Sequence, residues 1–319
     1  MTQHDSEPAV VAVVAAYRPS PSLVDTVREL LTQVSHIVVV DDGSPATAEP
    51  VLEELAAVGA TVLRQPTNSG IAAALNAGVE KARAQWNPEF FLTLDQDSSP
   101  TGQYVRLALD TYRRAMAAHL RVGFITAAAY SGHPVPLLHR KGPFIQPFDP
   151  MQSGFLIPSS TLERVGPFEE GLFIDGVDSE FTMRTRGAGL AVIVGEGCQI
   201  EHDLGEREPS TLFGRPLRIF GREVSYNYHS PSRVYYICRN GTLLTRRYGL
   251  KDPGWVGRRL VEELKAHVLR FAFSPGRLKL AQAAAAGFTD ALRGVTGRIP
   301  AELEQQLLRE RAGRRVPPQ

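Results

Sequence analysis

The sequence predicts an α/β protein with a mostly parallel central sheet, helices on both faces of that sheet, and a helical region at the C-terminal end. Strand and helix patterns alternate over the first hundred residues, with short loops between them. The expected strands are short apolar runs, which is typical of strands buried on both faces. From about residue 240 onward the patterns are helical. The alternation requires right-handed crossovers between parallel strands.

The first elements follow one another regularly. Val10–Ala16 is an apolar, β-branched run that predicts a buried strand. Apolar residues at helical spacing predict a helix over residues 22–34. The next expected elements are a strand at 37–40, a helix at 47–58, a strand at 61–63, a helix at 71–84 and a strand at 90–94. Ligands bind beyond the carboxyl ends of such strands, so the residues that follow each strand are the first candidates for a site.

The pattern is less regular after residue 100. The segment 131–152 contains five prolines and two glycines, which predicts loop or irregular β-structure. The other expected elements are a helix at 101–120, strands at 122–128 and 152–158, a helix at 176–187, a strand at 191–194, and helices at 255–273, 278–292 and 301–311. The C-terminal part of the chain is therefore expected to be helical.

Charge is distributed unevenly along the chain, although the formal net charge is only +1. Residues 1–238 hold 19 basic and 27 acidic side chains, and residues 239–319 hold 16 basic and 7 acidic ones. This asymmetry predicts two domains with that boundary and an anionic partner for the basic one. The candidates are a membrane surface, a phosphorylated ligand or nucleic acid. A hydrophobic content of 43% excludes a disordered or fibrous chain.

Several other classes are excluded by composition. Cys198 and Cys238 are the only cysteines, so a disulfide framework and a Cys-rich zinc site are both ruled out. Residues 1–8 are polar and acidic, unlike a signal peptide. No apolar run approaches the ~18 residues that a membrane-spanning helix needs. The sequence thus predicts a soluble chain in a reducing, cytoplasmic compartment, with a C-terminal region that could lie at the inner face of a membrane.

An acidic pair, Asp95 and Asp97, directly follows the apolar run at 90–94. Two carboxylates at this spacing in one loop suit a hard divalent cation such as Mg²⁺ or Mn²⁺. The alternative is a turn with solvated aspartates, because Asp and Ser are common turn residues. His202 follows a strand-like run and could complete a metal site with Asp97. A single histidine is, however, more often structural than a ligand.

A second acidic pair, Asp41 and Asp42, follows the run at 37–40 in the same way. Its carboxylates could accept hydrogen bonds from a nucleobase or from ribose hydroxyls, as acids do in other nucleotide-binding sheets. The alternative is a strand-to-helix turn whose acid caps the helix. The sequence contains neither GxGxxG nor a Walker A motif, which counts against dinucleotide and P-loop binding.

Small residues dominate the segment 68–78. Asn68 could cap the helix that follows, and the alanines and glycines would let this helix approach a neighbouring backbone or ligand closely. Asn76, in the middle of the helix, is costly unless its amide is satisfied. The N-terminus of this helix would also favour a phosphate. The alternative is a tightly packed Ala-rich helix with no ligand.

Acidic residues also begin the helix expected at 176–187. Asp178 could act as a general base, which needs reach to an acceptor hydroxyl more than an unusual pKa. The acids could instead only complement the helix dipole. Glu180 and Arg184 are four residues apart, so they are expected to form an ion pair.

Together these segments resemble the family 2 glycosyltransferases, which are inverting, nucleotide-sugar-dependent enzymes of the Rossmann-like GT-A fold. The resemblance covers roughly residues 9–240. Four motifs occur in the family's order, namely DDGS at 41–44, NSGIAAALNAG at 68–78, DQD at 95–97 and VDSEF at 177–181. The segments that look most like the bacterial rhamnosyltransferase subgroup are LDQDS at 94–98, QSGFLIP at 152–158, FIDGVDSEF at 173–181 and SPSRVYYICRN at 230–240.

The resemblance implies roles for individual residues. Asp42 would read the nucleobase, and Asp97 would be the more direct metal ligand of the DxD pair with Asp95. His202 would be a third metal contact. Asp178 would be the general base, although Val177 stands where the family usually has Glu, which leaves Glu180 open as an alternative. The donor nucleotide would also contact Ala15, Tyr17, Asp41, Asn68, Gly70, Asn76 and Asp95. The acceptor or the pyrophosphate would be contacted by Glu180, Arg233, Arg239 and Asn240.

The implied reaction is transfer of L-rhamnose from dTDP-L-rhamnose to a hydroxyl of a cell-surface glycan or a polyprenyl-pyrophosphate-linked acceptor, assisted by Mg²⁺ or Mn²⁺. A UDP-sugar donor stays open, because thymine and uracil would contact Asp42 alike. A nucleotidyltransferase is a different class of enzyme that would normally carry a Gly-rich phosphate loop, and no such loop follows the run at 10–16. A catalytically silent nucleotide-sugar-binding protein is a further alternative, and the presence of Asp178 argues against it.

The C-terminal helices have alternatives of their own. In the helix expected at 255–273, apolar residues 260, 261, 264, 268, 271 and 272 share one face. That face could pack on the rest of the protein, form a homo-oligomer, or lie on an anionic bilayer. Nucleic acid is the least favoured partner, because the basic residues lie off this apolar face, and we expect no binding to it.

Overall fold

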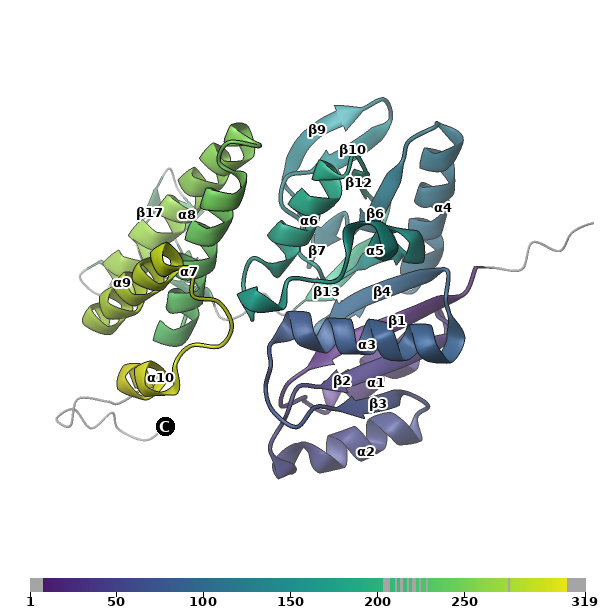
Figure 1. Cartoon of the computed structure of the whole chain (residues 1–319), viewed down its shortest axis with the longest axis horizontal. Coiled ribbons are helices and arrows are strands. Elements are labelled where there is room, and N and C mark those ends of the chain that lie inside the picture. The colour runs from purple at the N-terminus through teal and green to yellow at the C-terminus, as the bar shows by residue number, and fades with distance from the viewer. Residues whose placement is uncertain are drawn as a thin grey trace, which may run out of the picture. The chain divides into compact units, whose positions relative to one another are not determined.

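The structure is a computed structural model that describes residues 8–202, 207–209, 211–212, 215–216, 218–219, 222–223, 225–227, 229–274 and 276–308. The chain divides into two compact units, Met1–Leu204 and Gly205–Gln319 (Figure 1). The boundary expected after residue 238 lies inside helix α7 (Pro231–Tyr248) of the second unit. As a division between functions it stays a prediction.

The first unit is built on a seven-stranded sheet with the order β12-β6-β11-β4-β1-β2-β3. Strand β1 pairs in parallel with β2 and with β4, and β6 pairs in parallel with β12. Only β11 runs antiparallel to its neighbours. The strands are β1 (Val10–Ala16), β2 (His36–Asp41), β3 (Thr61–Arg64), β4 (Phe90–Asp95), β6 (Val122–Thr126), β11 (Phe155–Pro158) and β12 (Ala191–Val194). The mostly parallel sheet expected from the sequence is therefore confirmed.

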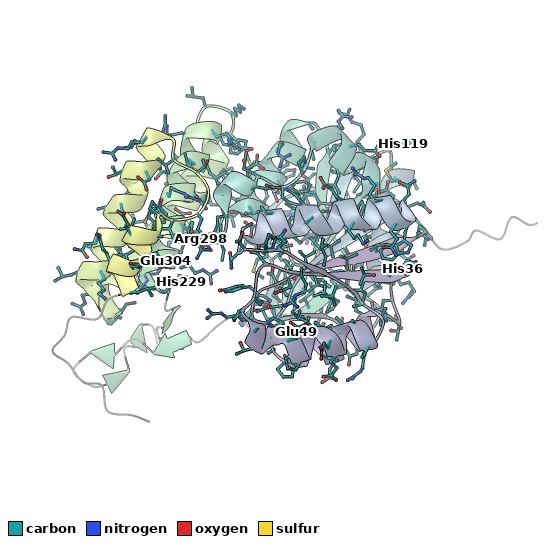
Figure 2. The ribbon with its side chains drawn as sticks, turned by 60° about the horizontal axis from the view of Figure 1, so that its bottom comes forward. His36, Glu49, His119, His229, Arg298 and Glu304 are labelled. Atoms are coloured by element: carbon teal, nitrogen blue, oxygen red, sulfur yellow. The ribbon has the colours of Figure 1, made fainter. Side chains whose placement is uncertain are left out.

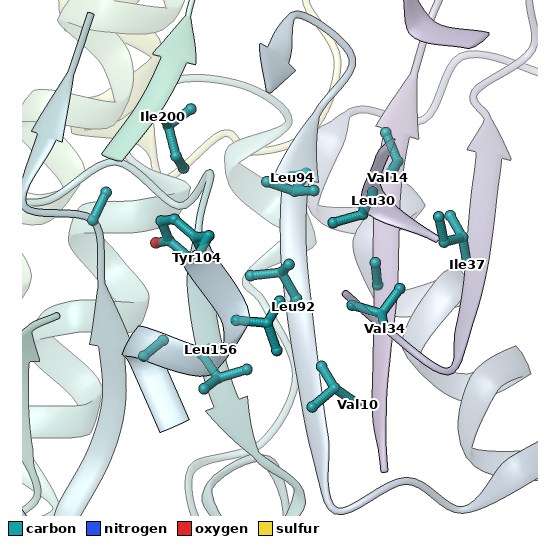
Figure 3. Close-up of a cluster of buried hydrophobic side chains, with 14 of the residues drawn as sticks. Val10, Val14, Leu30, Val34, Ile37, Leu92, Leu94, Tyr104, Leu156 and Ile200 are labelled. Carbon is teal, nitrogen blue, oxygen red and sulfur yellow. The ribbon is translucent and has the colours of Figure 1, made fainter. Parts of the chain in front are cut away.

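Helices cover both faces of this sheet (Figure 1). Alternate residues of β1, among them Val10 and Val14, belong to a core cluster that includes residues of α1 and α4. In Figure 3 this cluster lies between the strands and the helices, with Leu94 of β4 beside Val14 of β1. Helices α3 and α6 pack on the other face. The helices are α1 (Ser22–Leu30), α2 (Glu49–Ala57), α3 (Ile71–Trp86), α4 (Tyr104–Ala117), α5 (Ser159–Val165) and α6 (Val177–Gly187), with short 3-10 turns at Ala46–Ala48 and Glu170–Leu172.

Helix α3 approaches the sheet closely through Gly78. A Cβ atom at Gly78 would lie 2.3 Å from Cγ1 of Val13 and 2.9 Å from Cγ2 of Val40. Both valines are fully buried, so neither can move away without disturbing the core. The close approach expected from the small residues of 68–78 is thus explained by packing against β1 and β2.

We expect Gly78→Ala to destabilise the protein by about 1–3 kcal/mol through overpacking. The gain in helix propensity, about 1 kcal/mol for Gly to Ala, offsets only part of this cost. Gly187→Ala is the matched control, because a Cβ at that helical glycine meets nothing within 4 Å. Urea unfolding of both variants measures the difference. Equal stability of the two variants would contradict the packing argument.

Smaller sheets complete the first unit. Strands β5 (Ser98–Pro100), β13 (Gln199–His202), β7 (Ala129–Tyr130) and β8 (His133–Pro134) form a four-stranded sheet in that order. Strands β9 (Leu137–Lys141) and β10 (Phe144–Pro147) form a hairpin. These short strands match the irregular β-structure expected for residues 131–152. Helix α5 was not expected from the sequence.

The second unit is mainly helical, as expected. Helix α7 packs on α9 where Gly287 meets the backbone of Tyr235, since a Cβ at Gly287 would lie 2.5 Å from that carbonyl oxygen. The Tyr235 hydroxyl donates to Oδ2 of Asp290 at 2.7 Å. Arg298 and Glu304, labelled in Figure 2, form an ion pair at 3.4 Å. The helices after α7 are α8 (Pro253–Phe273), α9 (Arg277–Arg293) and α10 (Ala301–Leu308), and short β-ladders pair β14 (Arg207–Pro209) with β19 (Ser225–Asn227), β15 (Thr211–Leu212) with β16 (Arg215–Pro216), and β17 (Arg218–Ile219) with β18 (Arg222–Glu223).

Helix α7 begins well before residue 240, where the sequence patterns first suggested helix. Ser230 precedes it, and its Oγ accepts from the backbone N–H of Arg233 at 3.3 Å, with Pro231 at the first helical position. A serine cap followed by proline is a start signal that the sequence does contain.

Among the described helices, none combines the length and apolar character that a membrane crossing needs.

Candidate active site

The predicted acids converge at the carboxyl ends of three adjacent strands. In the register of the sheet, Ala16 of β1 lies beside Asp41 of β2, and Ala15 lies beside Asp95 of β4. The loop after β1 is tied to the acidic loop after β4, because the backbone N–H of Tyr17 donates to Oε1 of Gln96 at 2.9 Å. The parallel sheet therefore gathers residues that are up to 80 positions apart in the sequence onto one edge.

Asp95, Asp97 and His202 form the one group in the described residues that could hold a metal ion. One ligand atom from each lies within 4.8 Å of the others. His202 reaches the pair because β13 runs antiparallel to β5, with His202 opposite Ser98. Its Nδ1 lies 3.4 Å from Oδ1 of Asp97 and 2.7 Å from Oγ of Ser98. Two carboxylates and an imidazole are a ligand set that Mn²⁺ and Mg²⁺ accept, so the residues present fit a divalent cation.

Gln152 orients the carboxylate of Asp95. Its Nε2 donates to Oδ1 of Asp95, and its backbone carbonyl accepts from Oγ1 of Thr93 at 2.8 Å. The Oγ of Ser153 accepts from the backbone N–H of Asp95 at 3.1 Å. Because Gln152 is only 5% exposed, these contacts are shielded from water. The sequence contained this residue in QSGFLIP but offered no role for it.

We expect Gln152→Leu to weaken divalent-metal binding about 10–100-fold, the usual effect of removing a partner that orients a metal ligand. The variant keeps the size and burial of the side chain but removes the donor to Asp95. Titration of the full chain with Mn²⁺ measures the affinity, and thermal unfolding checks that the fold is retained. Unchanged Mn²⁺ affinity in a folded Gln152→Leu protein would show that Asp95 does not depend on this contact.

Asp42 ties the loop after β2 to the start of α3. Its two carboxylate oxygens accept from the backbone N–H groups of Ser69 and Gly70, at 2.7 Å and 2.8 Å. Gly70 has a φ of +94°, and a Cβ there would lie 2.4 Å from the carbonyl oxygen of Phe173. Asp42 therefore holds the helix N-terminus in place, and its role with a nucleobase stays a prediction.

Asn68 does not cap α3, which corrects that expectation. The residue before the helix is Gly70, and no side chain caps it. The carboxylate of Asp42 binds the N–H groups of Ser69 and Gly70, the two residues just before the helix. The Oδ1 of Asn68 is buried and has no hydrogen-bond partner among the described residues.

Asp41 and Asn76 make contacts of a structural kind. Asp41 is buried, and its carboxylate accepts from the N–H of Ser44 at 3.2 Å and lies 3.6 Å from Nε of Arg64. Asn76 binds the backbone of Phe168 in both directions, at 3.0 Å and 2.9 Å. It also donates to Oε1 of Glu170 at 2.8 Å. Its amide is thus satisfied, as its place in a helix required, by a segment more than 90 residues further along the chain.

Glu180 is committed to a buried ion pair. It is 2% exposed, and its Oε2 lies 2.8 Å from Nη2 of Arg184, which also donates to the carbonyl of Pro167 at 2.7 Å. The ion pair expected from the four-residue spacing is confirmed. The carboxylate of Glu180 is therefore buried and occupied by Arg184.

Asp178 is half-buried in the first turn of α6. Its Oδ1 accepts from the backbone N–H of Ser179 at 2.8 Å. Burial raises the pKa of the Tyr130 hydroxyl, and the negative charges of Asp95 and Asp178 raise it further. The pKa of this one hydroxyl is therefore raised by the charges of both carboxylates. The residues before α6 include left-handed backbone at Phe173 (φ +64°) and Asp175 (φ +61°), a strained conformation that often marks functional segments.

Tyr17 and Arg18 form an exposed edge beside the acids. Tyr17 is 37% exposed, and the guanidinium carbon of Arg18 lies 5.1 Å from the centre of its ring. The backbone N–H of Arg18 donates to Oγ of Ser44, which links this loop to the one after β2 at 2.7 Å. Ala15, by contrast, is 9% exposed within β1. Arg18 had no role in the sequence-based prediction.

The predicted arginines of the second unit differ from each other in exposure. Arg239 is fully buried, donates to the carbonyl of Gly297 at 2.6 Å and to Oδ1 of Asn240 at 2.9 Å, and contacts two tyrosine rings. This is a core position, which argues against the expected contacts of Arg239 and Asn240 with an acceptor. Arg233 is exposed in the first turn of α7.

Neither cysteine is suited to nucleophilic chemistry. Both are buried and free. Burial raises the pKa of Cys198 to about 12 and that of Cys238 to about 12, so both thiols stay protonated near neutral pH.

Comparisons with known proteins identify the family and the fold of the chain. Residues 11–172 match the family described as Glycosyl transferase family 2. The dTDP-rhamnosyl transferase RfbF of Shigella flexneri is 26% identical over 304 residues, which are 90% of this chain and 97% of RfbF. The crystal structure of S. aureus TarS has a TM-score of 0.51 at 18% identity and matches 93% of this chain. The chain spans 50% of the length of TarS, and this likeness concerns the fold.

Proposed function

The chain belongs to glycosyl transferase family 2, and on that premise we propose that it transfers L-rhamnose from dTDP-L-rhamnose to a hydroxyl group of a glycan or of a polyprenyl-pyrophosphate-linked acceptor. It is a glycosyltransferase of GT-A fold. The observation that carries the proposal is the cluster of Asp95, Asp97 and His202 after strand β4. The half-buried Asp178 is close enough to Tyr130 that its charge, like that of Asp95, raises the pKa of this hydroxyl. The similarity to a dTDP-rhamnosyl transferase supports the choice of donor.

In this proposal Asp178 removes the proton from the acceptor hydroxyl as that oxygen attacks the anomeric carbon. The attack comes from the face opposite the leaving nucleoside diphosphate, so the anomeric configuration inverts. The half-buried position of Asp178 supports this role over Glu180, whose carboxylate is held by Arg184. A positioned carboxylate of this kind contributes about 10²–10⁴-fold to the rate.

The proposed donor site lies along the loops after β1, β2 and β4. A divalent cation held by Asp95, Asp97 and His202 would supply positive charge to the leaving diphosphate. Asp42 fixes the start of α3, whose N-terminus is favourable for an anion. Tyr17 is exposed beside these loops, and in this proposal its ring contacts the nucleotide. The guanidinium of Arg18, next to that ring, adds positive charge for the nucleotide.

Two further readings are open to experiment. A UDP-sugar would fit the same acids as a dTDP-sugar, because thymine and uracil present the same hydrogen-bonding edge. A binding protein without activity would also use the donor site, but it would need no base at Asp178. The division of the chain at residue 238, with acceptor recognition or oligomer formation in the basic part, belongs to the same proposal.

A donor panel tests the proposed function. The full chain is incubated with dTDP-L-rhamnose, UDP-glucose and UDP-N-acetylglucosamine, with Mn²⁺ or Mg²⁺, and with glycan or polyprenyl-pyrophosphate-linked acceptors. Release of nucleoside diphosphate is measured. We expect acceptor-dependent release of dTDP above all. Preferential release of UDP would overturn the choice of donor, and tight dTDP-sugar binding without release against any acceptor would favour the binding protein.

A further inference from the structure

Exposed apolar side chains are concentrated in the second unit. Among the described residues, thirteen large apolar side chains are exposed, and ten of them lie between residues 250 and 308. The first unit contributes only Tyr17, Met116 and Leu137. Single exposed apolar residues are normal, but a concentration of this kind marks a surface that contacts something apolar.

Four of these residues form one stripe along α8. Leu260, Val261, Leu264 and Val268 are 47%, 52%, 64% and 59% exposed. At about 100° per residue these positions fall within one quarter to one third of the helix circumference. We call them the α8 stripe. The helix buries a different face, which carries Trp255, Val256 and Arg270.

A face of α8 beside the stripe is already occupied by α7. His267 lies 3.9 Å from the sulfur of Cys238, and the carboxylate of Glu263 lies close to Gly241. The α8 stripe is therefore not needed to attach the helix to its own unit. A helix that packs through one face and leaves a second apolar face exposed is built to bind along that second face.

Basic residues border the α8 stripe. Arg258 and Lys265 are exposed, and the helical period places both next to the stripe rather than across the helix from it. Lys265 lies 3.1 Å from Glu262, but an ion pair this exposed contributes little. Over residues 253–293 the chain has seven Arg and Lys against three Asp and Glu. The second exposed stripe, on α9, consists of Leu278, Phe288 and Leu292.

We propose that the α8 stripe lies on an anionic lipid bilayer. An apolar face bordered by Arg and Lys is the pattern of helices that lie in the interface of a membrane, with apolar side chains among the acyl chains and cations at the headgroups. A second copy of the chain is the less favourable occupant, because its surface would carry the same excess of positive charge. The proposal concerns a surface remote in sequence from the acids and does not rest on the proposed reaction.

Flotation of the full chain with lipid vesicles tests the proposal. Vesicles of phosphatidylcholine alone are compared with vesicles in which a third of the lipid is phosphatidylglycerol. We expect binding to the anionic vesicles that weakens as salt is added. Replacing Arg258 and Lys265 together by Gln should lower the affinity about 25-fold, since each basic residue near the surface contributes about fivefold.

The apolar contribution is tested with Leu264→Asp and Val268→Asp in one protein, which should abolish binding to anionic vesicles. The matched control is Met116→Asp, because Met116 is 45% exposed on α4 of the first unit. It should bind vesicles as the unchanged protein does. Release of nucleoside diphosphate with a water-soluble acceptor should be unaltered in both, so failure of this proposal is distinguishable from failure of the proposed reaction.

Two results would overturn the proposal. One is equal binding of the unchanged protein to neutral and anionic vesicles, or binding to neither. The other is a dimer in sedimentation equilibrium that the Leu264→Asp and Val268→Asp changes dissociate, which would make the α8 stripe an interface between copies of the chain.

Discussion

Replacement of Asp178 by Asn is expected to lower kcat by about 10²–10⁴-fold while leaving donor binding nearly unchanged. Asn has the same shape, and its Oδ1 can still accept the hydrogen bond from the N–H of Ser179 that Asp178 accepts now. What is lost is the ability to take a proton from the acceptor hydroxyl. Turnover is measured as acceptor-dependent release of nucleoside diphosphate, and donor binding by calorimetry with dTDP and Mn²⁺.

Glu180→Gln is the informative control for this experiment. Glu180 is buried against Arg184, so the change should lower stability by about 1–3 kcal/mol through the weakened charged hydrogen bonds. At a temperature where the protein stays folded, its turnover should remain close to that of the unchanged protein. Near-normal turnover of Asp178→Asn would refute the assignment. Loss of turnover in folded Glu180→Gln alone would transfer the role of base to Glu180.

Replacement of Asp97 by Ala is expected to weaken the Mn²⁺-dependent binding of dTDP by roughly 10–100-fold or more. Loss of a residue that only supports a metal ligand already has an effect of this size, and here a candidate ligand itself is removed. The side chain is 45% exposed and lies beside His202, so its removal leaves the core intact. Calorimetric titrations with dTDP in the presence of Mn²⁺ and of EDTA give the metal-dependent part of the affinity.

Asp110→Ala serves as the matched control for this second experiment. Asp110 is a similarly exposed aspartate that pairs with Arg106 and Arg113 on the surface of α4. Its removal should leave the dTDP affinity unchanged under both conditions. His202→Ala should act in the same direction as Asp97→Ala. If Asp97→Ala kept both the dTDP affinity of the unchanged protein with Mn²⁺ and the same difference between Mn²⁺ and EDTA, Asp97 would not be a metal ligand.

Much of the first unit was predictable because its signals are local. The apolar runs of β1, β2 and β4 and the helical spacing of α1 depend only on neighbouring residues. The pairing of Glu180 with Arg184 was predictable for the same reason, since one helical turn brings them together. In a parallel sheet the carboxyl ends of the strands share one edge, so the convergence of the acids also followed from the alternation of elements.

The contacts that set the details of the site join distant segments. Gln152 meets Asp95 across 57 residues, and His202 meets Asp97 only because β13 pairs with β5. No periodicity in the sequence predicts either contact, because each contact depends on how a loop returns to the sheet.

Competition between local groups was equally hard to foresee. Asn68 had the right chemistry for a cap, but Gly70 precedes α3, and the carboxylate of Asp42 binds the N–H groups of Ser69 and Gly70. Likewise Arg239 has the charge that suits a phosphate, yet two tyrosine rings and a carbonyl hold it in a core.

The amino-acid order therefore specifies the sheet, its helices and the acidic edge, because each arises from residues within a few positions of one another. The choice of partner for each polar side chain arises later, when loops from different strands pack together and the nearest donor or acceptor satisfies the group being buried. Burial then separates residues that stay exposed, such as Tyr17, from those that hold the fold, such as Asn76 and Glu180.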